Sequence, residues 1–296
     1  IWMDGELIPF EDAKIHVLSH TLHYGLGVFE GIRSYTQPDG SGGIFKLDEH
    51  IRRLMDSAKM CRLDVPFTFE QIRQGCIDTL RANEFDAAYI RPLIFLGMGG
   101  MGLGARNNPV HVALIVWKWG AYLGEEGLQS GIRVATSSFT RHHVNANLQR
   151  AKISGHYVNS IMARYEANDN GFDEAIMLDQ NGYVAEGTGE NLFVIRDGVV
   201  KTPPVVNILG GITRRTAIQI LEREGIKVHE MTFGRDALYI ADEIFMTGTA
   251  AEITPIREVD RRAVGEPGAI TRQVQETYTA GVRGEVPWMK PFITTF

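Results

Sequence analysis

Apolar residues recur at two spacings along this chain, and each spacing predicts one kind of secondary structure. Spacings of three and four residues predict helices over residues 48–62, 68–83, 212–224 and 269–280, and one more shortly after Lys152. Shorter apolar or alternating runs predict strands in residues 1–10, 88–96, 110–119, 131–139, 174–178, 183–185, 191–195, 199–202, 226–229 and 243–246. Strands outnumber helices without a regular βαβ alternation, so we predict an α+β fold with mostly antiparallel sheets.

Polar signals mark the ends of several of these elements. The dipeptides Asp-Gly at residues 4–5 and 197–198, and Asn-Gly at 181–182, predict hairpin turns. Thr68 and Gln71 have the spacing of a capping box, and Asp48 is the predicted N-cap of the helix before it. These signals fix the predicted helix starts within a few residues.

A glycine-rich stretch at residues 119–131 is the best candidate for a linker between domains. It divides the chain into a smaller N-terminal domain, residues 1–118, and a larger C-terminal domain, residues 132–296. A chain of 296 residues is long enough for two domains of ordinary size.

Composition excludes several classes of function. The chain is 44% hydrophobic and 22% charged, which is typical of a globular enzyme. Its net charge is −6 and its basic residues are scattered, so we expect neither nucleic acid nor an anionic membrane as a partner. The most apolar region, residues 92–105, is too short and glycine-rich to cross a bilayer. Cys61 and Cys76 lack metal or redox spacing and indicate a reducing, cytoplasmic compartment.

Two other motifs suggest functions that their context does not support. Residues 97–102 (GMGGMG) satisfy a dinucleotide-binding pattern, but a strand follows them where such a site requires a helix. We therefore interpret residues 97–109 as a loop of the kind that often covers an active site. His20 and His23 could bind a metal, but the sequence offers no third ligand at a recognisable spacing, and we expect none.

Lys152 is the most informative residue because of the groups that follow it. A phenol comes at Tyr157, a carboxylate at Glu186, and glycine-containing turns at Gly211 and Gly248. Chemically, these supply an amine for a Schiff base, a donor for a phenolate oxygen, a partner for a ring nitrogen and two anion sites. Pyridoxal 5'-phosphate requires these contacts of a protein. A solvated surface lysine is the alternative for Lys152 taken alone.

The sequences of these segments resemble those of branched-chain amino acid aminotransferases, which belong to the pyridoxal-phosphate enzymes known as fold type IV. The resemblance covers nearly the whole chain and includes HTLHYGLGVFEGIR, EHIRRLMDSAK, AYIRPLIF, WGAYLG, GYVAEGTGENLF, GITRR and GTAAEITP. It implies a two-domain α+β fold: a smaller N-terminal α/β sandwich and a larger cofactor-binding domain with a β-barrel-like sheet and helices.

The resemblance also implies roles for individual residues. Lys152 would form the internal aldimine with the cofactor and then act as the proton shuttle. The other cofactor-binding residues would be Arg53, Tyr157, Glu186, Leu209, Ile212, Thr213 and Thr249. The substrate would contact Tyr24, Phe29, Gly31, Tyr89, Arg91, Trp119, Tyr122, Thr249 and Ala250. Tyr24, Met101 and Leu103 would reach the partner subunit's site, which implies at least a homodimer.

The implied reaction is transamination between branched-chain L-amino acids and 2-oxoglutarate. A D-amino-acid or (R)-amine aminotransferase and an aminodeoxychorismate lyase share the fold and remain alternatives, and a non-catalytic binding module is a third. His156, Ile153 and Ser154 depart from the family pattern beside the lysine, as does the loop at residues 97–109. These departures bear on substrate preference and leave the set of cofactor-binding residues intact.

Overall fold

A computed structural model describes residues 1–120 and 122–296, which form two compact units. The first unit contains Ile1–Trp119, Ala151–His156 and Val282–Phe296, and the second contains Gly120–Arg150 and Tyr157–Gly281. Residues 151–156 and 282–296 therefore belong to the first unit, although the sequence placed them in the C-terminal domain. The predicted linker at residues 119–131 includes Ala121, which lies outside the described residues. The domain boundaries stay a prediction.

The described part of the first unit contains an eight-stranded sheet in which every pair is antiparallel. The strand order is β17-β5-β4-β6-β7-β1-β2, and β3 also pairs with β6. The bounds are β1 Trp2–Met3, β2 Glu6–Leu7, β3 Gly27–Phe29, β4 Ile32–Thr36, β5 Gly42–Phe45, β6 Ala88–Leu96, β7 Val110–Trp117 and β17 Ile293–Thr295. The hairpin predicted around Asp4 and Gly5 is confirmed, with positive φ at both residues.

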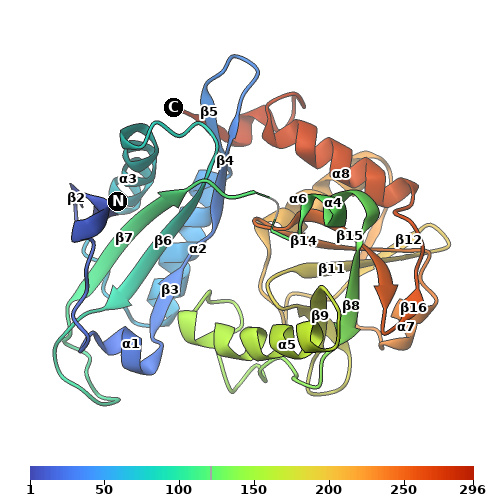
Figure 1. Cartoon of the computed structure of the whole chain (residues 1–296), viewed down its shortest axis with the longest axis horizontal. Coiled ribbons are helices and arrows are strands. Elements are labelled where there is room, and N and C mark those ends of the chain that lie inside the picture. Colours follow the sequence, from blue (N-terminus) through green and yellow to red (C-terminus); the bar gives the residue numbers. More distant parts are fainter. Residues whose placement is uncertain (121) are drawn as a thin grey trace. The chain divides into compact units, whose positions relative to one another are not determined.

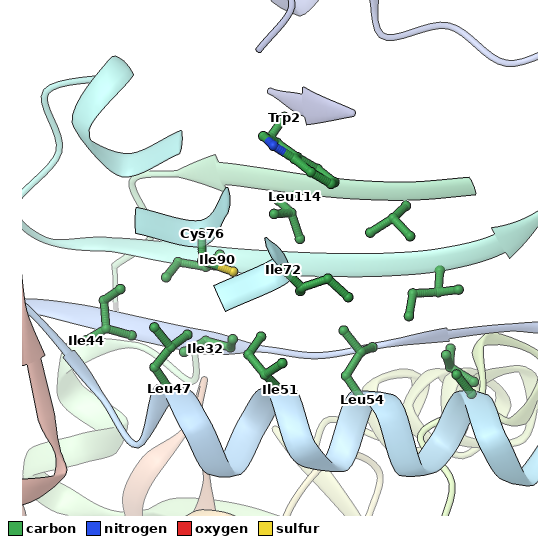
Figure 2. Packing of buried hydrophobic residues seen from close by; sticks show 14 of the residues in the cluster. Trp2, Ile32, Ile44, Leu47, Ile51, Leu54, Ile72, Cys76, Ile90 and Leu114 are labelled. Atoms are coloured by element: carbon green, nitrogen blue, oxygen red, sulfur yellow. The ribbon is translucent and has the colours of Figure 1, made fainter. Parts of the chain in front are cut away.

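Two helices, α2 (Leu47–Met60) and α3 (Phe69–Ala82), pack with this sheet around one hydrophobic core. Figure 2 shows Leu47, Ile51 and Leu54 of α2 pointing from one face of the helix towards the strands. These apolar residues recur three and four apart, as a helix buried on one face requires. The strands β6 and β7 contribute Ile90 and Leu114 to the same core.

The starts of the two helices test the polar signals. The capping box of Thr68 and Gln71 is confirmed at the start of α3. The predicted cap at Asp48 is wrong, because the N-cap of α2 is Lys46, which has a left-handed φ of 52°. Asp48 lies in the first turn instead, where it forms an ion pair with Arg73 of α3. A carboxylate also suits the positive end of the helix dipole at that position.

Short helices complete the first unit: η1 Phe10–Asp12, α1 His20–Tyr24, η2 Ser154–His156 and η3 Lys290–Phe292. Residues 97–109 run from β6 into β7 without a helix, as predicted. The segment that carries Lys152 is attached to the strands of this unit, since Ile153 forms a bridge with Val28 of β3. This attachment fixes the lysine against the sheet.

The second unit contains a nine-stranded sheet in its described residues, with the order β10-β9-β8-β15-β14-β11-β12-β13 and β16 beside β15. Its strands are β8 Ile132–Thr136, β9 Glu174–Leu178, β10 Val184–Gly187, β11 Asn191–Arg196, β12 Val199–Thr202, β13 Val228–Glu230, β14 Glu243–Gly248, β15 Glu252–Val259 and β16 Arg262–Ala263. The pairs β8 with β9, β8 with β15 and β12 with β13 are parallel, and the others are antiparallel. The hairpins predicted at residues 181–182 and 197–198 are confirmed.

The helices of the second unit are α4 Glu125–Ser130, α5 Tyr157–Asp169, α6 Ile212–Arg223, α7 Asp236–Tyr239 and α8 Ala269–Val282, of which the last residue, Val282, belongs to the first unit. Helix α5 packs on β8 and β9, whereas α6 packs on β13 and β14. In Figure 1, α5 and α8 lie on opposite sides of the strands of this unit. Among the described helices, none combines the length and apolar character needed to cross a membrane.

Candidate active site

The backbone of Lys152 is held from two directions within the first unit. Its carbonyl oxygen accepts a hydrogen bond from the Phe29 amide of β3 at 3.0 Å. Its own amide donates to Oγ of Ser57 on α2 at 3.1 Å. The side chain is half-buried, and Nζ lies 4.9 Å from the centroid of the Phe29 ring. Lys152 is therefore a fixed, partly enclosed amine and not a solvated surface lysine.

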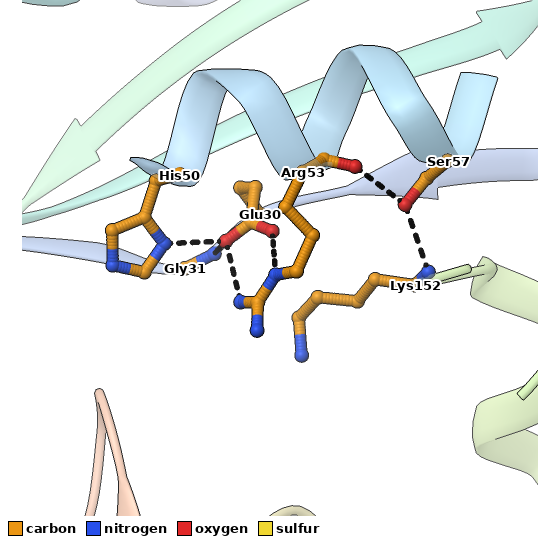
Figure 3. Close-up of polar contacts among 6 residues, drawn as sticks. All are labelled: Glu30, Gly31, His50, Arg53, Ser57 and Lys152. Carbon is orange, nitrogen blue, oxygen red and sulfur yellow. Dashed lines mark hydrogen bonds and ion pairs between the residues drawn. The ribbon is translucent and has the colours of Figure 1, made fainter. Parts of the chain in front are cut away.

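Arg53, the predicted phosphate ligand, is held by a carboxylate that the sequence analysis did not identify. Its Nε and Nη2 atoms bind Glu30 at 2.6 and 2.9 Å. Figure 3 shows the Arg53 guanidinium and the Lys152 side chain extending to the same side of α2. The structure thus brings the predicted anchor lysine and the predicted phosphate arginine together in one unit.

The residues predicted to contact substrate in this unit form an aromatic cluster around Arg91. The Arg91 guanidinium carbon lies 4.7 Å from the centroid of the Phe29 ring, 5.4 Å from that of Tyr89 and 5.6 Å from that of Trp117. Trp119 completes the cluster, with its ring 4.5 Å from that of Tyr89. Within residues 1–120 and 122–296, Arg91 forms no ion pair with a carboxylate, and its buried Nε has no hydrogen-bond partner. An enclosed guanidinium of this kind is suited to an anionic ligand.

Gly31 lies against the same cluster, at a position with no room for a side chain. A Cβ atom at this position would lie 1.8 Å from the Tyr89 hydroxyl oxygen, a distance that no side chain could tolerate. A glycine therefore lets the Tyr89 hydroxyl approach the backbone between β3 and β4. This contact places Gly31 and Tyr89 together, and both are residues for which the sequence analysis predicted a substrate contact.

Tyr24 is the last residue of α1, and 45% of it is exposed. Its ring lies 4.6 Å from the ring of His20. The Nε2 atoms of His20 and His23 lie 2.9 and 2.8 Å from the carbonyl oxygens of Gly102 and Val17, to which they can donate. These histidines thus connect α1 to neighbouring loops.

In the second unit, Glu186 of β10 is buried and receives hydrogen bonds from three groups. Arg141 Nη2 lies 2.8 Å from Oε1, and the Asn191 side-chain amide and the Leu209 backbone amide lie 3.0 and 3.2 Å from Oε2. All three are donors, which suits an ionised carboxylate. The structure therefore places Glu186 beside Leu209, another predicted cofactor residue, and adds Arg141 and Asn191, which the sequence analysis missed.

The turn before α6 precedes Ile212 and Thr213, the two residues predicted to bind the cofactor phosphate. Gly211 is the N-cap of α6 and provides no side-chain cap, so the first-turn amides have no intrahelical acceptor. A Cβ at Gly211 would lie 1.9 Å from Asn191 Oδ1, which explains why glycine is required. Asn191 also donates to the Leu209 carbonyl oxygen at 2.9 Å and so fixes the turn.

Thr249 and Ala250 follow β14, the strand on which α6 packs. Just before them, the hydroxyl of Thr247 is buried without a hydrogen-bond partner in the described part of the chain. Uncapped amides, an unsatisfied hydroxyl and a buried carboxylate are groups that a phosphorylated pyridine can satisfy. The residues of this unit therefore fit pyridoxal phosphate.

Tyr157 and Tyr122 are also in this unit. Tyr157 is the first residue of α5 and is half-buried. Burial, followed by the charges of Glu190 and Glu174, raises the pKa of Tyr122 to about 12. The pKa of Glu190 is itself raised to about 8, first by its own burial and then by Glu174. The two tyrosines thus form a cluster with the carboxyls of Glu190 and Glu174, and Tyr122 stays protonated in it.

Known proteins resemble this chain over nearly its full length. Residues 27–259 match the family described as amino-transferase class IV. The chain belongs to that family. As a class IV aminotransferase, it is 52% identical to a branched-chain-amino-acid aminotransferase of Pseudomonas aeruginosa, over 96% of this chain and 93% of the relative.

Solved structures of class IV aminotransferases confirm the predicted fold. The branched-chain amino acid aminotransferase of Escherichia coli is 43% identical with a TM-score of 0.95, covering 99% of this chain and 97% of that one. The T.th. branched-chain amino acid aminotransferase complexed with N-(5'-phosphopyridoxyl)-L-glutamate is also 43% identical, with a TM-score of 0.94 and the same coverage. The resemblance to this family and the fold type IV architecture are therefore both confirmed.

Proposed function

We propose that this class IV aminotransferase binds pyridoxal 5'-phosphate and transfers amino groups between branched-chain L-amino acids and 2-oxoglutarate. The observation that carries the proposal is the fixed position of Lys152, whose backbone is bound by Phe29 and Ser57 on the same unit as Arg53. The named relatives and the bound phosphopyridoxyl-glutamate of a similar enzyme support the choice of cofactor and reaction.

Lys152 is the covalent anchor of the cofactor in this proposal. When bound, pyridoxal phosphate supplies an aldehyde that exchanges amino groups and a ring that withdraws electrons from the substrate α-carbon. Lys152 Nζ, when it is not joined to the cofactor, would accept the proton that leaves that carbon. Phe29 and Ser57 hold the backbone of Lys152, so the freed amine has only its side-chain torsions to search.

The second unit provides the groups for the ring and the phosphate. Glu186, oriented by Arg141 and Asn191, is the partner of the ring nitrogen, because an anion favours its protonated form. Tyr157 would donate to the phenolic oxygen, and Leu209 would pack against the ring. In this proposal Ile212, Thr213 and Thr249 are phosphate ligands of the second unit, and Arg53 is the phosphate ligand of the first. The uncapped start of α6 supports this role for the first two.

Arg91 explains how one site can accept two kinds of side chain. The rings of Phe29, Tyr89 and Trp117 provide apolar surface for a branched aliphatic side chain. The guanidinium among them provides a charge for the distal carboxylate of glutamate. Trp119, Tyr122, Gly31 and Ala250 complete the substrate contacts in this proposal.

The protein acts as a homodimer, or a larger homo-oligomer, in the cytoplasm. Exposed apolar side chains on α1 and the 97–109 loop support an assembly, since Leu22, Met101 and Leu103 are 63%, 45% and 91% exposed. Tyr24, Met101 and Leu103 would enter the partner subunit's site. Gel filtration with light scattering would test this, and a monomer at micromolar concentration would overturn it.

A panel of amino donors tests the proposed reaction. With 2-oxoglutarate as acceptor, L-leucine, L-isoleucine and L-valine should support turnover, and D-alanine and (R)-1-phenylethylamine should be slower by at least about tenfold, a difference of about 1.4 kcal/mol in the barrier. Faster turnover with D-alanine or the (R)-amine would instead identify one of the alternative aminotransferases. Lys152→Ala should abolish transamination of every donor, and a near-normal rate in that variant would refute its role.

A further inference from the structure

Glu30 is a charged residue in the interior of the first unit, with 0% of its surface exposed. Its carboxylate accepts four hydrogen bonds, two of which come from Arg53 (Figure 3). The other two come from His50 Nδ1 at 2.7 Å and the Gly31 amide at 3.2 Å. A buried carboxylate with this many hydrogen-bond donors forms a specific polar network.

The contacts within this network determine which of its groups are charged. Burial alone would raise the pKa of Glu30, but the charges and hydrogen bonds of Arg53 and His50 outweigh it and hold that pKa well below its usual range. Burial lowers the pKa of His50 and outweighs the attraction of Glu30. Glu30 is therefore an anion, and its partner His50 is a neutral ring that donates from Nδ1.

One face of α2 carries three side chains that connect this network to Lys152. His50, Arg53 and Ser57 are spaced by three and four residues and so lie on one side of the helix. Ser57 Oγ donates to the Arg53 carbonyl oxygen at 2.7 Å and accepts from the Lys152 amide at 3.1 Å. A single helical face therefore fixes both the guanidinium and the backbone of the lysine (Figure 3).

We propose that Glu30 is a positioning residue that fixes the Arg53 guanidinium for the cofactor phosphate, and that His50 fixes Glu30 in turn. This inference rests on the proposed phosphate role of Arg53. A bidentate carboxylate holds the planar guanidinium in one orientation, so less side-chain freedom is lost when the phosphate binds. His50 and Gly31 occupy Oε2 of Glu30 and prevent the carboxylate from turning with the arginine.

Cofactor affinity with and without the phosphate group tests the proposal. The full-length protein, freed of cofactor, is titrated with pyridoxal 5'-phosphate and with pyridoxal, which lacks the phosphate. Glu30→Gln should weaken binding of the phosphorylated compound by about 10- to 100-fold, as loss of a ligand-orienting contact commonly does. Its affinity for pyridoxal should change less than about threefold, within the error of independent sites. Equal weakening of both compounds would show a merely structural role and overturn the proposal.

Variants of His50 provide an independent measurement if Glu30→Gln folds poorly. His50→Asn can keep an N–H donor near the position of Nδ1 and should retain most of the affinity for pyridoxal 5'-phosphate. His50→Leu removes that donor and should lose affinity for this compound but not for pyridoxal. Equal affinities in the two His50 variants would contradict the inference. Asp48→Asn, on the exposed side of the same helix, is the matched control and should bind both compounds normally.

An Arg53→Ala background separates this inference from the proposed function. If Glu30 acts through Arg53, then Glu30→Gln should have little further effect once the arginine is absent. A full additional loss in the double variant would overturn the positioning role. Unchanged affinity for pyridoxal 5'-phosphate in Arg53→Ala itself would refute the phosphate role of Arg53 and the inference with it. A loss in Arg53→Ala without one in Glu30→Gln would overturn the inference alone.

Discussion

Each unit contains a buried arginine–glutamate pair, and the two pairs differ in which partner we assign to the cofactor. In the first, Glu30 is fully enclosed and holds Arg53, the residue proposed for the phosphate. In the second, Arg141 holds Glu186, the residue proposed for the ring nitrogen. The residue assigned to the cofactor is thus the cation of the pair in the first unit and the anion of the pair in the second. Because each partner neutralises the other, a buried charge can be kept at a fixed orientation.

Loss of Arg141 should have the largest effect. Arg141→Met leaves the Glu186 carboxylate buried without its cation, which should lower the free energy of unfolding by about 3–5 kcal/mol. It should also lower kcat by about 10- to 100-fold, because Glu186 loses the group that orients it. Urea unfolding and steady-state kinetics measure the two effects. Arg141→Lys is the control and should recover part of the stability, and wild-type stability in Arg141→Met would contradict the importance of this pair.

Glu190 sharpens the comparison because no described arginine forms an ion pair with this buried carboxyl. Its pKa of about 8 exceeds that of an unfolded glutamate, so between pH 5 and 8 the folded protein keeps a proton that the unfolded chain has lost. This difference lowers stability as the pH rises, by up to about 1.4 kcal/mol per unit, and the loss stops above the folded pKa. Glu190→Gln cannot ionise, so its stability should fall less over that range.

Urea unfolding of both proteins at several pH values isolates this term, since other titrating groups are common to both. Parallel stability curves for wild type and Glu190→Gln between pH 5 and 8 would mean that Glu190 is ionised in the folded protein. In that case an arginine partner would not be what separates Glu186 and Glu30 from Glu190.

Arg91 extends the comparison to an arginine with aromatic neighbours in place of a carboxylate. Removing one ring by Trp117→Leu should cost about 1–2 kcal/mol of cation–π interaction, or a factor of roughly 5–30. We expect this loss to appear as a higher KM for glutamate, because only glutamate needs the charge of Arg91. The KM for leucine should change less than about twofold. Equal increases for both substrates would show that Trp117 only shapes the apolar pocket. Arg91→Lys keeps the charge but loses the planar stacking on the rings. It should raise the KM for glutamate relative to that for leucine more than Trp117→Leu does.

The exposed pair of Arg73 and Asp48 should have the smallest effect. Both side chains are partly in solvent, where an ion pair contributes about 1 kcal/mol or less. Asp48→Asn should therefore lower the free energy of unfolding by no more than that and leave kcat unchanged. A loss as large as that of Arg141→Met would mean that burial is not what distinguishes the pairs at Glu30 and Glu186.

Local signals in the sequence predicted much of the fold. The strands β6, β9 and β12 were predicted with their observed bounds, and the capping box of α3 depends only on neighbouring residues. The start of α2 was less accurate, because the left-handed conformation of Lys46 is determined by the strand that leads into it. Strand β15 and the parallel pairing of β8 with β9 and β15 were missed, since residues far apart in sequence form them.

The candidate site divides in the same way. Lys152, Arg53 and Glu186 could be proposed from the sequence because they lie in recognisable motifs. Glu30, His50 and Arg141 were missed, although Glu30 lies in the same FEGIR motif as Gly31. A carboxylate between two apolar strands could have been suspected of being buried and paired. The identity of its partners could not, because Arg53 meets it only when α2 packs against β3.

Reduction of the holoenzyme with borohydride, followed by peptide mass analysis, tests the central claim most directly. Borohydride converts an imine between a lysine and pyridoxal phosphate into a stable bond, so the modified peptide identifies the anchor. We predict a single phosphopyridoxyl adduct, on the peptide that contains Lys152. An adduct on another lysine, or none in protein that binds the cofactor, would contradict the assignment of Lys152.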